Sequence, residues 1–312
     1  SEACRKSSRV FKTLLVVSTF ALAVKGAHGV YVFRAEAEQW DFTLIVDTVL
    51  VFGVFLGLLS CGAHRSRSDL AKVEQVLASY VAQGGRSSAT LDLCGLDAAV
   101  AVALCAVAVA SRVIFTAEDE LMALQVGTFA VVTFLIAGQV CTIHRACRGL
   151  LGIVDDFSHK VAESQDFSSA IQNWNLICAI LRHASAVVQG CLVSMVVTGA
   201  STLLAGVFGY TQGALRLSSL PGLGVGVAAV QTCLWTAAVT SKCSHVVPLL
   251  ATVAGKGVLD ADRMYAMQHI VHVEAGFYVC NTRVTRSATM KALYIGCAVV
   301  VSFVVQFNAM VP

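Results

Sequence analysis

Residues 292–311 read ALYIGCAVVVSFVVQFNAMV, a run of twenty residues without a formal charge. A helix rises 1.5 Å per residue, so about 20 apolar residues cross the ~30 Å hydrocarbon core of a bilayer. The composition of the chain agrees, because 57% of its residues are hydrophobic and 13% are charged, against about a quarter charged in soluble domains. The run predicts a membrane-spanning helix, and the composition predicts an all-α polytopic membrane protein.

Scanning the chain with the same window gives seven candidate spans, counting the last. They lie at about 10–33, 42–63, 93–115, 121–143, 177–209, 222–248 and 288–310. Basic residues before the first run are also typical of a secretory signal peptide, but the run lacks a clear small-residue cleavage site, so we expect a retained first helix. The prediction is a single seven-helix membrane domain over residues 1–312.

The basic residues predict how the chain is oriented. Fourteen lie in the N-terminal segment and in every second connection, and two lie in the other connections. The first set is Arg5, Lys6, Arg9, Arg65, Arg67, Lys72, Arg86, Arg145, Arg148, Lys160, Lys256, Arg263, Arg283 and Arg286; the second is Arg34 and Arg216. Because cytosolic loops carry the excess of Lys and Arg, we predict a cytosolic N-terminus and an extracellular C-terminus, with localisation in the plasma membrane. A G-protein-coupled receptor has the reverse orientation.

The three inner connections are much longer than the three outer ones. Each alternates apolar and polar residues at helical spacing. We predict cytosolic helical extensions at about 64–92, 144–176 and 251–287 that form an inner anchor region.

Polar and aromatic residues form one stripe on the last predicted span. Ser302, Phe303, Gln306 and Phe307 lie along it at helical spacing. A Gln exposed to lipid is costly, so the stripe should face protein or water. Either Gln306 hydrogen-bonds a neighbouring helix, or several copies surround an axis where Gln306 and Ser302 line a pore that the two Phe residues gate.

These features resemble the insect gustatory and odorant receptor superfamily. The resemblance consists of seven spans, a cytosolic N-terminus, long inner loops, and a last helix that ends in Gln306-Phe307. In that family five apolar residues and a preceding Thr-Tyr stand before Gln-Phe; here residues 301–305 fill the five positions, and Val299-Val300 replace Thr-Tyr. Gly276-Phe277 is similar to a Gly-Phe pair of the family, at a longer separation.

The resemblance implies a chemoreceptor-like ligand-gated cation channel that is neither an enzyme nor a nucleic-acid-binding protein. Four subunits, identical or related, would each place the last helix, 288–310, around a central pore. Its partners would be a small organic ligand, cations and membrane lipid, and no cofactor is expected. Ser302, Phe303, Gln306 and Phe307 would be the pore-lining or gate residues.

Polar groups in the outer half of the bundle are the candidates for binding the ligand. They are Lys25, His28, Asp47, Arg112, Gln125, Ser201, Thr202, Gln231 and Trp235. An alternative is that Lys25 and Asp47 form a structural ion pair and that Arg112 extends to the membrane interface. The outer connections carry six acids against two bases, which either concentrate cations at an external mouth or are simply solvated.

Histidines at the inner ends of spans offer an enzymatic alternative. Three imidazoles, from His64, His144 and His245, could hold a zinc ion that activates water, as in the progestin and adiponectin receptor family. His269 and His272 lie nearby at i, i+3 spacing, where that family has i, i+4. Histidines at an interface are more often polar helix ends, so the channel remains the favoured interpretation.

Overall fold

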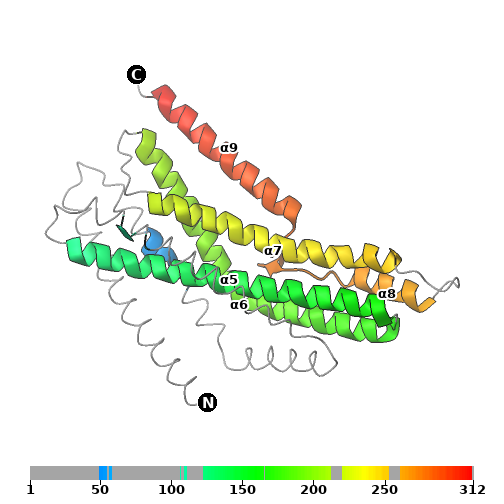
Figure 1. Ribbon diagram of the computed structural model, residues 1–312. Helices are drawn as coiled ribbons and strands as arrows, with labels where there is room; N and C mark the ends of the chain where they lie inside the picture. The colour runs from blue at the N-terminus through cyan, green and yellow to red at the C-terminus, as the bar shows by residue number, and fades with distance from the viewer. Residues whose placement is uncertain are drawn as a thin grey trace, which may run out of the picture.

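The computed structural model describes residues 49–54, 56–57, 106, 109–110, 122–164, 166–211, 220–252 and 261–310. Helices form almost all of this part (Figure 1). In chain order the elements are α5 (Met122–Ser164), α6 (Phe167–Thr211), α7 (Leu220–Thr252), α8 (Ala261–His272), β1 (Tyr278–Val279), β2 (Thr282–Arg283) and α9 (Arg286–Met310). Residues 49–54 and 56–57 are also helical. Lys25, His28, Asp47, His64 and Arg112 lie outside the described residues, as do the predicted first span and most of the second and third.

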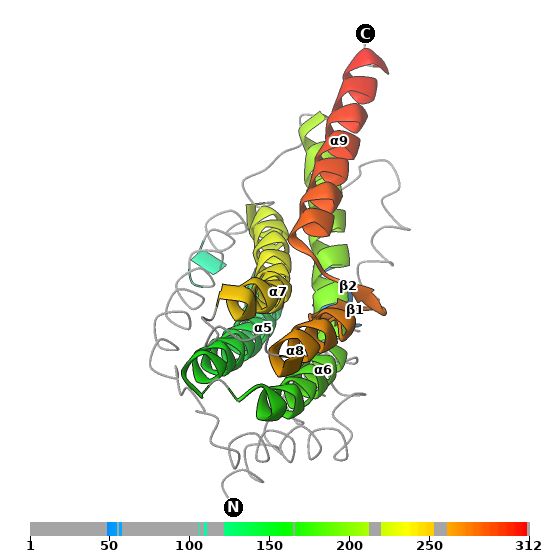
Figure 2. The same ribbon diagram turned by 90° about the vertical axis from the view of Figure 1, so that its right-hand side faces the viewer.

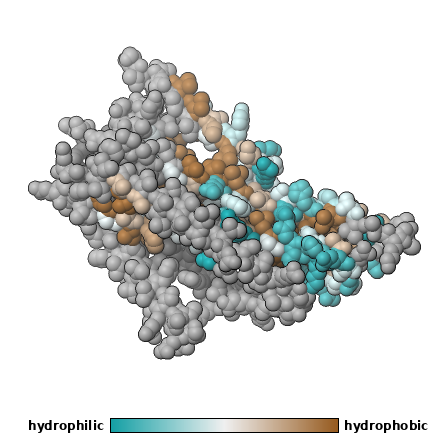
Figure 3. Space-filling view, in the orientation of Figure 1, coloured by the Kyte–Doolittle hydropathy of each residue, from teal (hydrophilic) through white to brown (hydrophobic). Residues whose placement is uncertain are grey.

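Three of the described helices are long and apolar enough to cross a membrane, namely α5, α6 and α7. The protein is therefore a multi-pass membrane protein. These helices do not stop at the limits of a bilayer: α5 has 43 residues and α6 has 45, which at 1.5 Å per residue is about 65 Å, twice the hydrocarbon thickness. Figure 3 shows hydrophilic side chains gathered over the end that carries α8, and hydrophobic ones toward the opposite end.

A short connection joins α5 to α6, and its Asp166 is the residue just before Phe167, where α6 begins. Asp166 Oδ1 accepts a hydrogen bond from the Ser169 N–H at 3.2 Å, which satisfies one of the free donors at the helix start. The Ser169 N–H and hydroxyl, together with the Ser168 N–H, lower the pKa of the Asp166 carboxyl below its usual value. The two longest helices thus run antiparallel beyond the lengths predicted for their spans.

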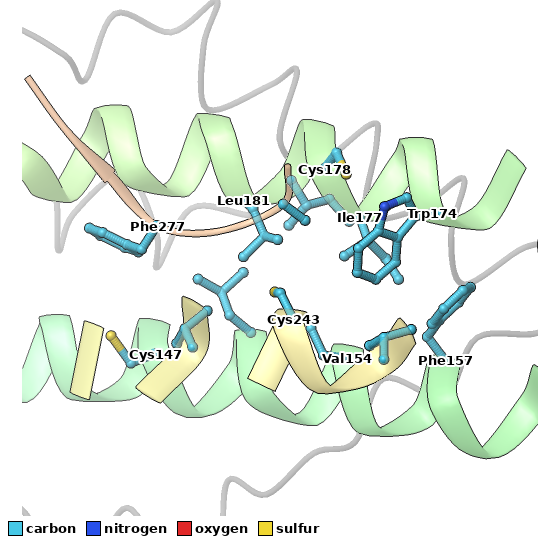
Figure 4. Close-up of a cluster of buried hydrophobic side chains, with 14 of the residues drawn as sticks. Cys147, Val154, Phe157, Trp174, Ile177, Cys178, Leu181, Cys243 and Phe277 are labelled. Carbon is cyan, nitrogen blue, oxygen red and sulfur yellow. The ribbon is translucent and has the colours of Figure 1, made fainter. Parts of the chain in front are cut away.

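The main core lies between the halves of α5 and α6 that are joined by this turn, with α7 and α8 completing it (Figure 4). Phe157 of α5 and Trp174 of α6 are both 1% exposed, and their rings lie 5.2 Å apart between centroids. Leu250 of α7 and Ile270 of α8 are buried in the same cluster. Aromatic rings bury large apolar areas, so this end is a well-packed helical unit.

A smaller core brings residues 49–54 against α5 and α7, with Gly53 and Gly57 facing α6 and α5. A Cβ atom at Gly53 would collide with the Thr198 side chain, and one at Gly57 would lie 2.6 Å from Ser194 Oγ and 2.7 Å from Gln139 Nε2. Glycine is needed at Gly53 because the Thr198 side chain of another helix occupies the space of a Cβ atom, whereas at Gly57 the ends of two side chains would have to move.

One part of the predicted inner anchor is wrong in its local structure. The sequence predicts helix through most of 251–287, but α8 ends at His272, and residues 278–283 form a two-stranded antiparallel hairpin. Its turn residues, Cys280 and Asn281, have positive φ values of 49° and 61°, which a continuous helix cannot contain. Over the described residues the fold is all-α except for this hairpin, and the last helix starts at Arg286 rather than at 288.

Replacing Asp166 with Ala is expected to lower the thermal unfolding midpoint, because the first turn of α6 loses its cap. Asp166→Asn is the matched control, since its side-chain oxygen can still accept the Ser169 N–H. The folded-state pKa of Asp166 is depressed, so its contribution is complete above the unfolded-state pKa, about 3.8, and is lost as the pH falls through the lower folded value. The difference between wild type and Asp166→Ala, measured in detergent, should shrink over that acidic range; a difference independent of pH would contradict this role of the carboxylate.

Candidate functional site

The last helix, α9, leaves the bundle that its own chain forms. Figure 2 shows it projecting beyond α7 and α8, with the C-terminus at its far end. Among the described elements, its main contacts are with α6 and α7. Among the described side chains of α9, Thr289 is the one that is buried, whereas Tyr294 is 77% exposed and Val305 is 62% exposed. An apolar helix exposed in this way requires lipid or protein around it.

A Thr cap fixes where α9 begins. Thr285 Oγ1 accepts the N–H of Ala288 at 3.2 Å, and the hydroxyl of Thr289 donates back to the Thr285 carbonyl at 3.0 Å. Thr at this position satisfies a free donor of the first turn, as N-cap residues do. The helix therefore starts at Arg286, directly after this Thr.

Residues 273–285, here called the junction, connect α8 to α9 and are held by side chains of α6 and α7. The Phe277 N–H donates to Thr240 Oγ1 of α7 at 3.0 Å, and the Tyr278 N–H donates to Ser185 Oγ of α6 at 3.1 Å. Phe277 itself is fully buried in the main core. Two helices thus supply the hydrogen bonds that the non-helical backbone of the junction cannot form internally.

Gly276 and Arg283 fit together within the junction. A Cβ atom at Gly276 would lie 2.8 Å from Arg283 Nε and 3.0 Å from Thr240 Cγ2, so the position has no room for a side chain. The Arg283 guanidinium donates to the Ala275 carbonyl at 2.7 Å and to Ser244 Oγ of α7 at 3.2 Å. The Gly276-Phe277 pair, singled out in the sequence for its resemblance to a family motif, is therefore the point where the junction fits against α7.

The predicted pore-lining residues all lie in the C-terminal half of α9. Ser302 is exposed. Phe303, Gln306 and Phe307 are helical, but their side chains lie outside the described set. The structure therefore shows that all four residues belong to α9, and their roles in lining or gating a pore remain predictions.

The ligand-binding candidates that the structure describes are spread over three helices and differ in exposure. Thr202 of α6 is buried and its hydroxyl donates to the Gly199 carbonyl of the same helix at 3.0 Å, while neighbouring Ser201 is half-buried. Gln231 of α7 is exposed. Gln125 lies near the start of α5, and its side chain is not among those described.

Trp235 of α7 lies beside residues that the sequence assigns to the inner end of α5. Its ring is 4.3 Å from that of His144 between centroids, and the Arg148 guanidinium lies 5.6 Å from the ring centroid, within range of a cation–π interaction. The structure groups Trp235 with this inner set rather than with Ser201 and Thr202.

The described histidines of the zinc alternative are in different surroundings. His144 contacts Trp235, His245 is exposed on α7, and His269 Nε2 lies 3.0 Å from Asn175 Oδ1 of α6. Over the described ranges, no group of three or more His, Cys, Asp or Glu side chains is arranged to hold a metal ion. Nothing in this part of the chain favours the hydrolase.

The residues that hold the junction were missed at the sequence level. Thr232, Thr236, Thr240 and Ser244 recur every four residues along α7, a polar stripe that was visible in the sequence. Thr232 and Thr236 donate within their own helix, to Ala229 and Cys233 carbonyls. The sequence could have indicated the stripe, but not which of its hydroxyls accepts a hydrogen bond from the backbone of the junction.

Replacing Thr240 with Val is expected to loosen the junction, because a buried Phe277 N–H loses its acceptor while the side chain keeps its shape. An unsatisfied buried donor costs about 1–3 kcal/mol. Hydrogen–deuterium exchange of peptides covering residues 276–280 should accelerate. Thr236→Val is the matched control, since Thr236 is equally buried and bonds only within α7; equal acceleration in both variants would show that the Thr240 hydroxyl does not hold the junction.

Comparison with known proteins bears on the fold. No protein-family model matches the sequence, and no curated protein matches it significantly. Among solved structures, the insect olfactory receptor OR5 from Machilis hrabei matches with a TM-score of 0.67 and 10% sequence identity, over 97% of this chain and 88% of that one. The chain therefore has the fold of an insect olfactory receptor, which confirms at the level of the fold the resemblance seen in its sequence.

Proposed function

We propose that the chain is a subunit of a chemoreceptor-like ligand-gated cation channel in the plasma membrane, and that four copies, identical or related, place α9 around a central pore. The observation that carries the proposal is the exposure of α9. Exposed apolar side chains, such as Tyr294, Ile295 and Val305, occupy more than one side of this helix, away from its own bundle. The likeness in fold to an insect olfactory receptor supports the chemoreceptor part of the proposal.

The polar position on α9 favours a shared axis over lipid on all sides. Ser302 is exposed in the single chain. Polar side chains within a membrane usually face protein or water rather than lipid, so a partner or an aqueous pore should lie beside Ser302. Around an axis shared by four copies, Ser302 and Gln306 would supply a weakly polar lining, and Phe303 and Phe307 a hydrophobic constriction that gates by dewetting.

The junction gives this proposal a path from the bundle to the pore. A ligand bound among α6 and α7, with Ser201, Thr202 and Gln231 as candidates, would bias the positions of the two helices that hold Phe277 and Tyr278. Because α9 follows the junction directly, a small displacement there would move the pore helix. A small organic ligand suits a site with few polar groups.

The proposed orientation places the C-terminus outside the cell. An epitope tag appended after Pro312 should be stained by antibody on intact cells, because the positive-inside distribution puts this end opposite the basic connections. A tag placed between Ser164 and Asp166, in the turn between α5 and α6, should stain only after permeabilisation. The reverse pattern would contradict both the orientation and the channel.

Cysteine at position 302 should become accessible within the pore. In a background with Cys280 and Cys297 replaced by Ser, both being free and exposed, a charged methanethiosulfonate reagent should reduce the whole-cell current of Ser302→Cys. The current would be evoked by an active compound from a screening panel. Val301→Cys, about 100° away around the helix, should be unaffected. Modification of Val301→Cys alone would place another face of α9 at the axis, and the absence of any evoked cation current would contradict the proposed function.

A further inference from the structure

The charges on α9 are few and of one sign. Arg286 and Lys291 are the charged residues of this helix, and both are exposed. Lys291 directly precedes the apolar run that starts at Ala292. Glu274, in the junction, is the last acidic residue of the sequence, and its carboxylate lies 4.0 Å from the Arg283 guanidinium. Within the described part of the chain, no acidic side chain forms an ion pair with Lys291.

The position of Lys291 on the helix aligns it with Ser302. Eleven residues separate them, which at 3.6 residues per turn is about three full turns and a residual rotation of about 20°. Along the axis the separation is about 16 Å. Any arrangement that turns Ser302 toward a shared axis therefore turns Lys291 toward the same axis, near the end of α9 where the helix begins. Arg286 is rotated by about 140° from Lys291 and points to another side.

We propose that Lys291 lines the cytosolic mouth of the pore as a ring of positive charges and makes the channel pass inward cation current more readily than outward current. This inference rests on the proposed function, because it requires four copies of α9 around one axis. It assigns to Lys291 a role in ion conduction that the polar stripe of Ser302, Phe303, Gln306 and Phe307 does not include.

The physical reason is the local concentration of ions at each mouth. Positive charges at a pore mouth repel cations and lower their local concentration. The effect extends over about one Debye length, ~10 Å at 0.1 M salt. Cations that enter from the cytosol are thus scarcer at the pore than in bulk solution. The connections predicted from the sequence to be extracellular carry six acids against two bases, which would favour cation entry from outside.

The test compares outward with inward current in symmetrical NaCl, using spontaneous openings of the purified protein in planar phosphatidylcholine bilayers. At about 0.05 M salt, Lys291→Gln should raise the ratio of outward to inward current by roughly twofold to fivefold, and Lys291→Glu should raise it further. Lys291→Arg should match wild type. At about 1 M salt the differences should largely disappear, because the Debye length falls to about 3 Å. Arg286→Gln is the matched control and should change the ratio much less than Lys291→Gln does, because Arg286 lies on another side of the helix.

A second measurement keeps the proposal testable in protein that does not open. With Cys280 and Cys297 replaced by Ser, Lys291→Cys should be cross-linked between copies by a short bis-maleimide, and Arg286→Cys should not. Absence of cross-linking at position 291, or an unchanged current ratio in Lys291→Gln, overturns the inference. If Ser302→Cys is nevertheless modified within the pore, the channel stands and only the role of Lys291 is wrong; if neither position shares an axis, the proposed function fails as well.

Discussion

Two hydrogen bonds from the backbone of the junction to hydroxyls on neighbouring helices determine where the last helix goes. The Phe277 N–H donates a hydrogen bond to Thr240 Oγ1 of α7, and the Tyr278 N–H donates one to Ser185 Oγ of α6. A break between two helices leaves polar backbone groups that water cannot reach when the segment is buried. Because these helices supply the missing acceptors, the chain can leave α8, cross the bundle surface and begin α9 in a direction of its own.

The rest of the described structure follows from a division between a packed unit and an unpacked helix. The paired halves of α5 and α6 extend well beyond the thickness of a bilayer and bury Phe157 and Trp174 between them, with α7 and α8 closing the core. In α9, by contrast, most of the described side chains are exposed. The core of α5 to α8 is thus stabilised by contacts within the chain, whereas the apolar side chains of α9 are left exposed. This arrangement is expected if other subunits or lipid cover α9.

Much of the helical layout could be predicted, because the signals are local. The apolar runs predicted at 177–209 and 222–248 lie within α6 and α7, and the run predicted at 121–143 lies within α5 from Met122 onward. Helix limits were less well predicted, since a hydropathy window detects what enters the membrane and not where hydrogen bonding ends. The junction was predicted as helix because its apolar residues fit a helical period, whereas positive φ values at Cys280 and Asn281 and the acceptor on Thr240 decide otherwise.

The candidate site divides in the same way. The sequence by itself determined that this is a helical membrane protein, that α9 is apolar with a polar stripe, and that Lys291 and Ser302 share a face, because composition and helical period depend only on residues close in the chain. Tertiary structure alone decided that Gly276 must lack a side chain, that Trp235 lies against His144 and that most of the described side chains of α9 are exposed. These facts depend on which helices meet, and residues distant in sequence are brought together only when the chain packs.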